Sequence, residues 1–117
     1  MTNIAMTSSE SYEDALGVKM CDHMLIMPFR PALIGRTGFL HGGAIAGLLS
    51  LACDRIVGDD AWCFTSTFQF LRGARQGDLH AVATIARGAS IATVNAMAWQ
   101  DDERRPVASA CRKYRLT

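Results

Sequence analysis

The chain has 117 residues, of which 50% are hydrophobic and 20% are charged, and its formal net charge is +1. These values fit one folded domain over residues 1–117 and exclude a disordered chain. There is no basic stripe with interleaved aromatic residues, so we expect no nucleic-acid partner. No segment approaches the ~20 apolar residues of a membrane span, so we expect no membrane partner either.

The N-terminal residues 1–17 (MTNIAMTSSESYEDALG) are polar and acidic and lack the basic start and apolar run of a signal peptide. The cysteines form no C-x-x-C pair and no His/Cys cluster at zinc spacing. They are Cys21, Cys53, Cys63 and Cys111. Each stands in an apolar run, so we expect a cytoplasmic protein with buried, reduced thiols and no metal site.

The second half of the chain carries scattered arginines. They are Arg72, Arg75, Arg87, Arg104, Arg105, Arg112 and Arg115. The simplest interpretation places them on solvated strand edges and hairpin loops. The alternative is that one or two of them meet a phosphate group.

Three elements are predicted in the first third of the chain. Residues 8–16 (SSESYEDAL) predict a short helix, with a serine cap and acidic residues in its first turn. Residues 18–28 (VKMCDHMLIMP) favour a strand whose methionines fill the core. Residues 31–40 (PALIGRTGFL) contain one proline and two glycines, which predicts a loop long enough to line a site.

The clearest helix covers residues 41–57 (HGGAIAGLLSLACDRIV). Its apolar residues recur at helical spacing and define one face. That face consists of Ile45, Leu48, Leu49, Ala52 and Ile56. Gly58 and the two aspartates after it end the helix.

Four strand candidates follow the helix, joined by connections of hairpin length. They are residues 62–72, 78–87, 90–100 and 106–116. Consecutive hairpins predict an antiparallel meander in which each strand pairs with the next. A long helix beside such a meander must bury its apolar face in the sheet, which predicts an α+β fold.

The helix start at His41, Gly42 and Gly43 has the features of an anion site. The first turn of a helix presents free backbone N–H groups, and the helix dipole favours negative charge there. Two glycines let a ligand approach the backbone closely. Such a terminus can hold a phosphate or polarise a carbonyl group as an oxyanion hole does. The residues alone leave open a glycine-rich entry that only tightens the start of the helix.

Opposite the apolar face, Gly43, Gly47, Ser50 and Asp54 fall within one narrow sector, at about 100° per residue. A solvent-exposed face more often carries Lys and Glu, so these small residues indicate close approach by a ligand or by a partner subunit. Subunit packing without chemistry is an equal alternative. The two interpretations coincide if the site lies at the interface.

The segment LHGGAIAGLL resembles the helix start of the hotdog-fold thioesterase superfamily, in particular the PaaI-like acyl-CoA thioesterases. The segment from FQFLRGARQGDLHAV to CRKYRL resembles the C-terminal strands of that family, with Gly73 where the family has proline. MPFRPALIGRTGFLHGG resembles the approach to the helix, so the similarity covers about residues 18 to 116. It implies a hotdog fold, a long central helix wrapped by a curved antiparallel sheet of about five to six strands.

The resemblance also implies a homodimer or a dimer of dimers with the active site between subunits. The substrate would be an acyl-CoA thioester, so coenzyme A is part of the substrate and no cofactor is expected. The N–H of Gly42 would polarise the thioester carbonyl, and His41 would line the pocket. The remaining contacts to substrate and CoA would come from Gly43, Cys63, Thr65, Arg87, Gly88 and Ser90.

The chain departs from the family nine residues after His41, where the family has a catalytic carboxylate and this chain has Ser50. A serine hydroxyl needs a partner base before it can act as a nucleophile. Asp54, one turn further along the same face, is the candidate replacement, and a salt bridge near the helix end is its alternative role. We therefore expect a thioesterase for small or medium acyl-CoA. The alternative is a catalytically weak or inactive acyl-CoA-binding subunit that pairs with an active paralogue.

Overall fold

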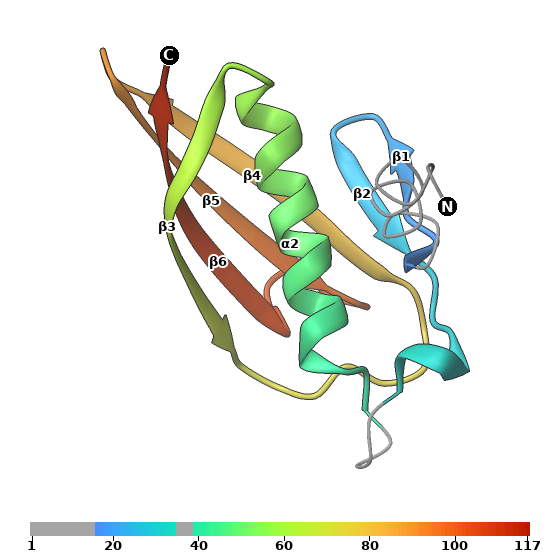
Figure 1. Ribbon diagram of the computed structural model, residues 1–117. Helices are drawn as coiled ribbons and strands as arrows, with labels where there is room; N and C mark the ends of the chain where they lie inside the picture. The colour runs from blue at the N-terminus through green and yellow to red at the C-terminus, as the bar shows by residue number, and fades with distance from the viewer. Residues whose placement is uncertain (1–15, 35–38) are drawn as a thin grey trace, which may run out of the picture.

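The computed structural model describes residues 16–34 and 39–117. One long helix lies across one face of a six-stranded antiparallel sheet (Figure 1). The elements are β1 (Lys19–Cys21), β2 (Met24–Met27), the short 3-10 helix η1 (Pro31–Leu33), α2 (Gly42–Val57), β3 (Ala61–Phe70), β4 (Leu79–Arg87), β5 (Ile91–Trp99) and β6 (Ala108–Leu116). The α+β class is confirmed. No helix within the described ranges is long and apolar enough to cross a membrane.

The predicted N-terminal elements are only partly accessible to comparison. Of the helix expected at residues 8–16, all but Leu16 lies outside the described residues. The single strand expected at 18–28 is wrong, because this segment forms a hairpin of β1 and β2. The turn is made by Asp22, whose φ of 56° lies in the left-handed region that a short polar side chain tolerates. In the loop expected at 31–40, η1 is followed by a bridge between Ile34 and Leu40.

The strand order is β1-β2-β4-β5-β6-β3. The meander prediction is correct for β4, β5 and β6 but wrong for β3, which pairs with β6 along its length instead of with β4. Two backbone hydrogen bonds position the connection over residues 71–78 so that β3 and β4 do not form a hairpin. Leu71 N–H donates to Val107 O at 2.8 Å, and Leu40 N–H donates to Ala74 O at 2.9 Å. The chain therefore crosses below the helix start, and β3 becomes an edge strand.

The core lies between α2 and the concave face of the sheet. Leu48, Leu49 and Cys53 have no exposed surface. The sheet contributes mostly alanines to the same core, namely Ala81, Ala92, Ala96, Ala98, Ala108 and Ala110. Small side chains on the helix-facing side of β4–β6 let the helix approach the backbone closely while the sheet curves around it. The alanines that weaken the strand pattern in the sequence are therefore the contact surface for the helix.

Two predictions about burial need correction. Ile56, expected on the apolar face of the helix, is 37% exposed because it lines a cavity of ≈ 310 Å³ between α2 and the β1–β2 hairpin. The four cysteines were expected to be buried, but only Cys53 is fully buried. Cys21 is exposed on the outermost strand, and Cys63 and Cys111 are half-buried.

Both ends of α2 are capped by specific contacts. At the start, His41 is the N-cap, and its Nδ1 accepts the Gly43 N–H at 3.3 Å. At the end, Gly58 has a φ of 90° and donates its N–H to Asp54 O at 3.1 Å. Arg87 of β4 donates from Nη2 to Val57 O at 2.7 Å. The helix predicted over 41–57 is thus correct to within one residue.

We predict that Leu48→Ala lowers the free energy of unfolding by about 2–5 kcal/mol, because it leaves a cavity in the fully buried helix–sheet contact. Urea unfolding followed by circular dichroism measures this change. Ile56→Ala on the same helix is the control, and its loss should be clearly smaller because the side chain is partly exposed. Equal losses for the two variants would contradict this account of the core.

Candidate functional site

The candidate residues on α2 form two separate groups. One is the helix start, where His41, Gly42 and Gly43 are all exposed. The other contains Ser50 and Asp54 in the second half of the helix. A helix rises 1.5 Å per residue, so Gly42 lies about 12 Å from Ser50 and about 18 Å from Asp54 along the axis. One chain therefore carries two candidate half-sites that are too far apart along the helix to contact the same bond.

The helix start presents one uncommitted donor. Because His41 Nδ1 accepts the Gly43 N–H, the proton of a neutral His41 imidazole resides on Nε2. The Gly42 N–H has no acceptor within residues 16–34 and 39–117. The Phe70 ring at the end of β3 lies 3.7 Å from where a Gly42 Cβ would stand. The Gly42 N–H is therefore an exposed donor at the positive end of the helix dipole, beside an aromatic wall.

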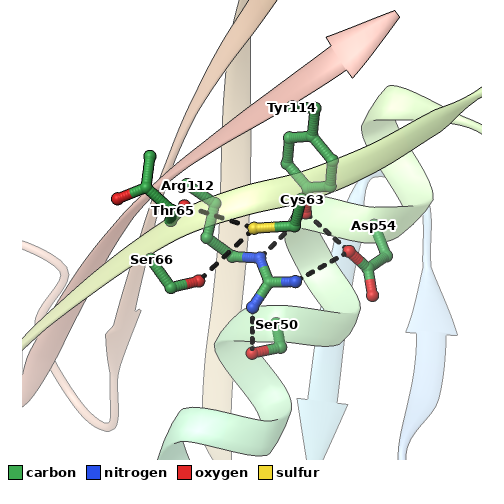
Figure 2. A network of polar contacts seen from close by, with 7 residues as sticks. All are labelled: Ser50, Asp54, Cys63, Thr65, Ser66, Arg112 and Tyr114. Atoms are coloured by element: carbon green, nitrogen blue, oxygen red, sulfur yellow. Dashed lines mark hydrogen bonds and ion pairs between the residues drawn. The ribbon is translucent and has the colours of Figure 1, made fainter. Parts of the chain in front are cut away.

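The second group is a polar cluster of Ser50, Asp54, Arg112 and Tyr114 (Figure 2). Arg112 of β6 donates from Nη1 to Ser50 Oγ at 3.0 Å and from Nη2 to Asp54 Oδ1 at 3.3 Å. Tyr114 donates its hydroxyl to the same Asp54 Oδ1 at 2.5 Å and accepts from Arg112 Nε at 2.9 Å. This polar cluster ties the helix to the sheet and fixes the orientation of all four side chains.

A β-bulge positions the strand that faces the polar cluster. The register of β3 against β6 shifts between Cys63 and Thr65, with Cys63 opposite Tyr114 and Ser66 opposite Arg112. The extra residue lets Cys63 and Ser66 both point toward the polar cluster. The Cys63 Sγ lies 3.2 Å from Thr65 O and 3.6 Å from Ser66 Oγ (Figure 2). Two residues of this strand were predicted to contact the substrate. The Cys63 side chain lies beside the polar cluster, whereas the Thr65 backbone carbonyl contacts the Cys63 thiol.

The charges of the polar cluster are balanced but unequally exposed. The side chain of Arg112 is 15% exposed and that of Asp54 is 53% exposed. Both hydrogen bonds to Asp54 reach Oδ1, which leaves Oδ2 toward solvent. Ser50 Oγ accepts from Arg112, so its own proton can be donated to a water or a ligand. The polar cluster can therefore hold a water molecule between Ser50 and Asp54.

Arg112 and Tyr114 were not predicted as site residues. Arg112 was interpreted as a solvated strand residue, yet it is the least exposed partner of this ion pair. The alternation of side chains between the two faces of the last strand could have identified both residues. Residues two apart share one face of a strand, so Arg112 and Tyr114 belong to the same face as the buried Ala108 and Ala110.

The predicted contacts at the β4–β5 turn have different roles in the structure. Arg87 is used at the end of α2, where it bonds Val57 O. Gly88 donates its N–H to Ile91 O at 2.8 Å, and a Cβ there would lie 3.1 Å from that oxygen, so the tight turn favours glycine. Ser90 is exposed and accepts the Leu116 N–H through its carbonyl. Within the described ranges, no group of three or more His, Cys, Asp or Glu residues is placed to hold a metal.

Comparison with known proteins gives a consistent result. The family model for the acyl-CoA thioesterase N-terminal domain matches residues 31–112. The Escherichia coli PaaI protein from the phenylacetic acid degradation operon superposes with a TM-score of 0.83 at 21% identity, covering 97% of this chain and 88% of that one. A Bacillus halodurans protein solved with CoA gives a TM-score of 0.75 at 19% identity, covering 88% and 74%. A Chromobacterium violaceum protein gives 0.75 at 26% identity, covering 99% and 90%. No protein with a curated function matches. These similarities confirm the hotdog fold.

The buried Cys53 thiol and Tyr114 hydroxyl should make the fold less stable at high pH. Burial raises the pKa of the Cys53 thiol from 9.0 to about 12. Burial, together with the hydrogen bond to Asp54, raises the pKa of the Tyr114 hydroxyl above its ordinary range. The unfolded chain loses these protons first, so the stabilisation is complete below pH ~9 and is lost as the pH rises toward about 12.

We therefore expect the urea midpoint to be lower at about pH 10.5 than at about pH 8. This decrease in the urea midpoint should be smaller in Cys53→Ala, which removes one of the two buried titratable groups. A Cys21→Ala variant is the control, because Cys21 is exposed and should leave the drop unchanged. A midpoint independent of pH over this range would show that neither group is held protonated by the fold.

Proposed function

Because the chain belongs to the acyl-CoA thioesterase N-terminal domain family, we propose that it hydrolyses a small or medium acyl-CoA thioester at the interface of a homodimer. The observation that carries this proposal is the division of the candidate site. The Gly42 N–H and the polar cluster are separated by about 12–18 Å on one rigid helix. A second chain is needed to bring these two halves together.

The edge strand β3 is the surface that we propose for the dimer. It has 10 residues, and one of its two sides is unpaired within the described chain. Trp62 is 53% exposed, and Phe70 and Leu71 at the other end of the strand are 55% and 50% exposed. Unpaired edges with apolar side chains favour pairing with another strand. Pairing β3 with a second β3 in antiparallel orientation satisfies both edges with one two-fold contact.

A two-fold axis perpendicular to the paired strands places both helices on the same side of the joined sheet and runs them in opposite directions. The helix start of one chain then faces the second half of the partner's helix. This arrangement brings Gly42 of one subunit toward Ser50 and Asp54 of the other. The small-residue face predicted on α2 is only partly open, because Gly47 is buried within the chain whereas Gly43 and Asp54 are exposed. The exposed part of this face would lie between the two helices, where it leaves room for an acyl chain.

The proposed chemistry follows from these groups. The thioester carbonyl accepts the Gly42 N–H, and the positive end of the helix stabilises the negative charge that develops on its oxygen. Ser50 orients a water, and Asp54 Oδ2 takes a proton from it as the water oxygen attacks the carbonyl carbon. Collapse of the tetrahedral intermediate breaks the carbon–sulfur bond. The proton then passes to the leaving sulfur, which gives a carboxylic acid and CoA.

Other residues have supporting roles in this proposal. Arg112 and Tyr114 hold Asp54 through Oδ1, so that Oδ2 faces the water. The His41 imidazole lines the pocket and fixes Gly43 through its Nδ1. The reaction requires no cofactor, because CoA is part of the substrate.

The second candidate function is an acyl-CoA-binding subunit with weak or no hydrolysis, which pairs with an active paralogue. Two observations favour it. Ser50 stands where the family resemblance places a carboxylate, and Asp54 Oδ1 is already engaged by two donors. A polar cluster that is satisfied internally can stabilise the fold without doing chemistry.

A thiol-release assay on a panel of acyl-CoAs tests the first function. We expect Gly42→Pro to lower kcat/KM by about 10²–10³-fold, because it removes one oxyanion donor. Proline suits the first position of a helix, and His41 is already extended, with φ −63° and ψ 135°, so the helix should still form. Asp54→Ala should lower the rate by about 10²–10⁴-fold.

Gly42→Ala is the control for the first variant, because it keeps the N–H and its Cβ makes an ordinary 3.7 Å contact with Phe70. The loss of kcat/KM in Gly42→Pro beyond that in Gly42→Ala then measures the contribution of the Gly42 N–H donor. Turnover that is unaffected by Gly42→Pro and Asp54→Ala would contradict the assignment. Tight binding of acyl-CoA with no release of thiol would establish the binding subunit instead.

A mixing experiment tests whether the site is shared. Gly42→Pro and Asp54→Ala damage opposite halves, so a mixed dimer retains one intact site. Random exchange of subunits should restore roughly a quarter of the wild-type activity. The control is a mixture of two separately tagged Asp54→Ala chains, which should restore none. If the Gly42→Pro and Asp54→Ala mixture also stays inactive although exchange is verified by mass spectrometry, both groups act within one chain and the interface proposal is wrong.

A further inference from the structure

A second cleft lies at the end of the molecule where α2 begins. It has a volume of ≈ 290 Å³ and is formed by the β3–β4 connection and the β5–β6 turn. Three arginines, Arg72, Arg75 and Arg105, line it together with Asp101 and Asp102. We call it the arginine cleft. It belongs to neither half-site described above.

The walls of the arginine cleft are held by specific hydrogen bonds. The Gln100 side chain donates from Nε2 to Arg75 O at 2.7 Å and to Gly77 O at 3.1 Å, and its Oε1 accepts the Arg75 N–H at 3.0 Å. Arg72 donates from Nε to Pro106 O at 3.0 Å. The two connections that form the cleft are therefore tied to one another, so the backbone that carries the arginines is fixed before any ligand arrives.

The positive charge in the arginine cleft is available to a ligand. Arg104 neutralises Asp102 with two contacts of 3.1 Å and 3.3 Å, which leaves Asp101 as the acid that opposes the three arginines. The guanidinium groups of Arg75 and Arg105 have no hydrogen bond or ion pair to any described residue, and Arg75 lies 4.9 Å from the Phe39 ring centroid. Uncommitted guanidinium groups on a fixed backbone are well suited to bind phosphate.

The arginine cleft adjoins the helix start. The β3–β4 connection passes directly below it, since Leu40 N–H bonds Ala74 O and a Cβ on Gly73 would lie 2.5 Å from the Phe39 ring. Phe70, at the beginning of this connection, faces Gly42. A long ligand whose reactive end lies at Gly42 could therefore extend along the connection and place an anionic end among the arginines.

We propose that the arginine cleft binds the 3′-phosphate of the nucleotide end of CoA. The proposal rests on the proposed function, because it assumes that the thioester lies at Gly42. It differs from the expectation that Arg87 meets the ligand. Arg87 is committed to Val57 O, and Arg112 is committed to the polar cluster. Arg75 and Arg105 line the same cleft, their guanidinium donors are free, and the cleft adjoins the helix start.

Calorimetric titration of the wild-type protein with CoA, dephospho-CoA and 3′,5′-ADP tests this inference. Dephospho-CoA lacks only the 3′-phosphate, and we expect it to bind about 10-fold or more weakly than CoA. Arg75→Gln and Arg105→Gln should each weaken CoA binding by a similar factor while leaving dephospho-CoA binding nearly unchanged. Arg115→Gln is the matched control, since that guanidinium lies over the Phe64 ring and does not line the arginine cleft.

The outcomes separate this inference from the proposed function. Binding of 3′,5′-ADP that Arg105→Gln abolishes supports the arginine cleft even if no acyl-CoA is hydrolysed. Equal affinities for CoA and dephospho-CoA, or a CoA affinity that Arg105→Gln changes no more than Arg115→Gln does, would overturn the inference even if hydrolysis is brisk. Binding of inorganic phosphate that Arg105→Gln abolishes, without binding of 3′,5′-ADP, would also overturn it, because the phosphate would then come from another source.

Discussion

The close contact between α2 and an alanine-lined sheet positions every candidate site residue. Leu48 and Leu49 reach the strands because alanines on β4, β5 and β6 leave room for the helix backbone. Large side chains there would lift the helix away from the sheet, and Arg112 would then be too far away to reach both Ser50 and Asp54. The polar cluster therefore depends on the packing beneath it. Its geometry is a consequence of the core and not of a flexible loop.

This dependence gives Arg112 two roles that are hard to separate. It joins the helix to the sheet, and it orients the carboxylate that stands one turn beyond the expected position. A half-buried guanidinium without Asp54 would be an uncompensated charge, so the ion pair has a structural value whether or not hydrolysis occurs. The same interaction can thus serve a hydrolase and a binding subunit, and only measurements of turnover distinguish them.

Local patterns in the sequence predicted the local structure well, but they did not predict the long-range pairing. The helix was located to within one residue because its apolar spacing and capping residues are adjacent in the chain. The place of β3 beside β6 was missed, since a connection of hairpin length also fits a crossing held by Leu40 and Ala74. The hairpin at Asp22 depended on one residue with positive φ. The contacts that Arg87 and Arg112 make with α2 join residues 30 or more positions apart, as in the bond from Arg112 to Ser50 with a separation of 62, and no local pattern encodes them.

The two edges of the sheet are unequal, and this difference bears on how the protein can assemble. At one edge β3 offers 10 residues, whereas at the other β1 has only three, all of them exposed and one of them a lysine. A chain with two long edges could add further copies without limit and grow into a fibre. In the proposed dimer, the contact between two β3 strands would consume both long edges, and the short charged strand is a poor template for further addition. The architecture therefore favours an assembly of defined size over an open polymer.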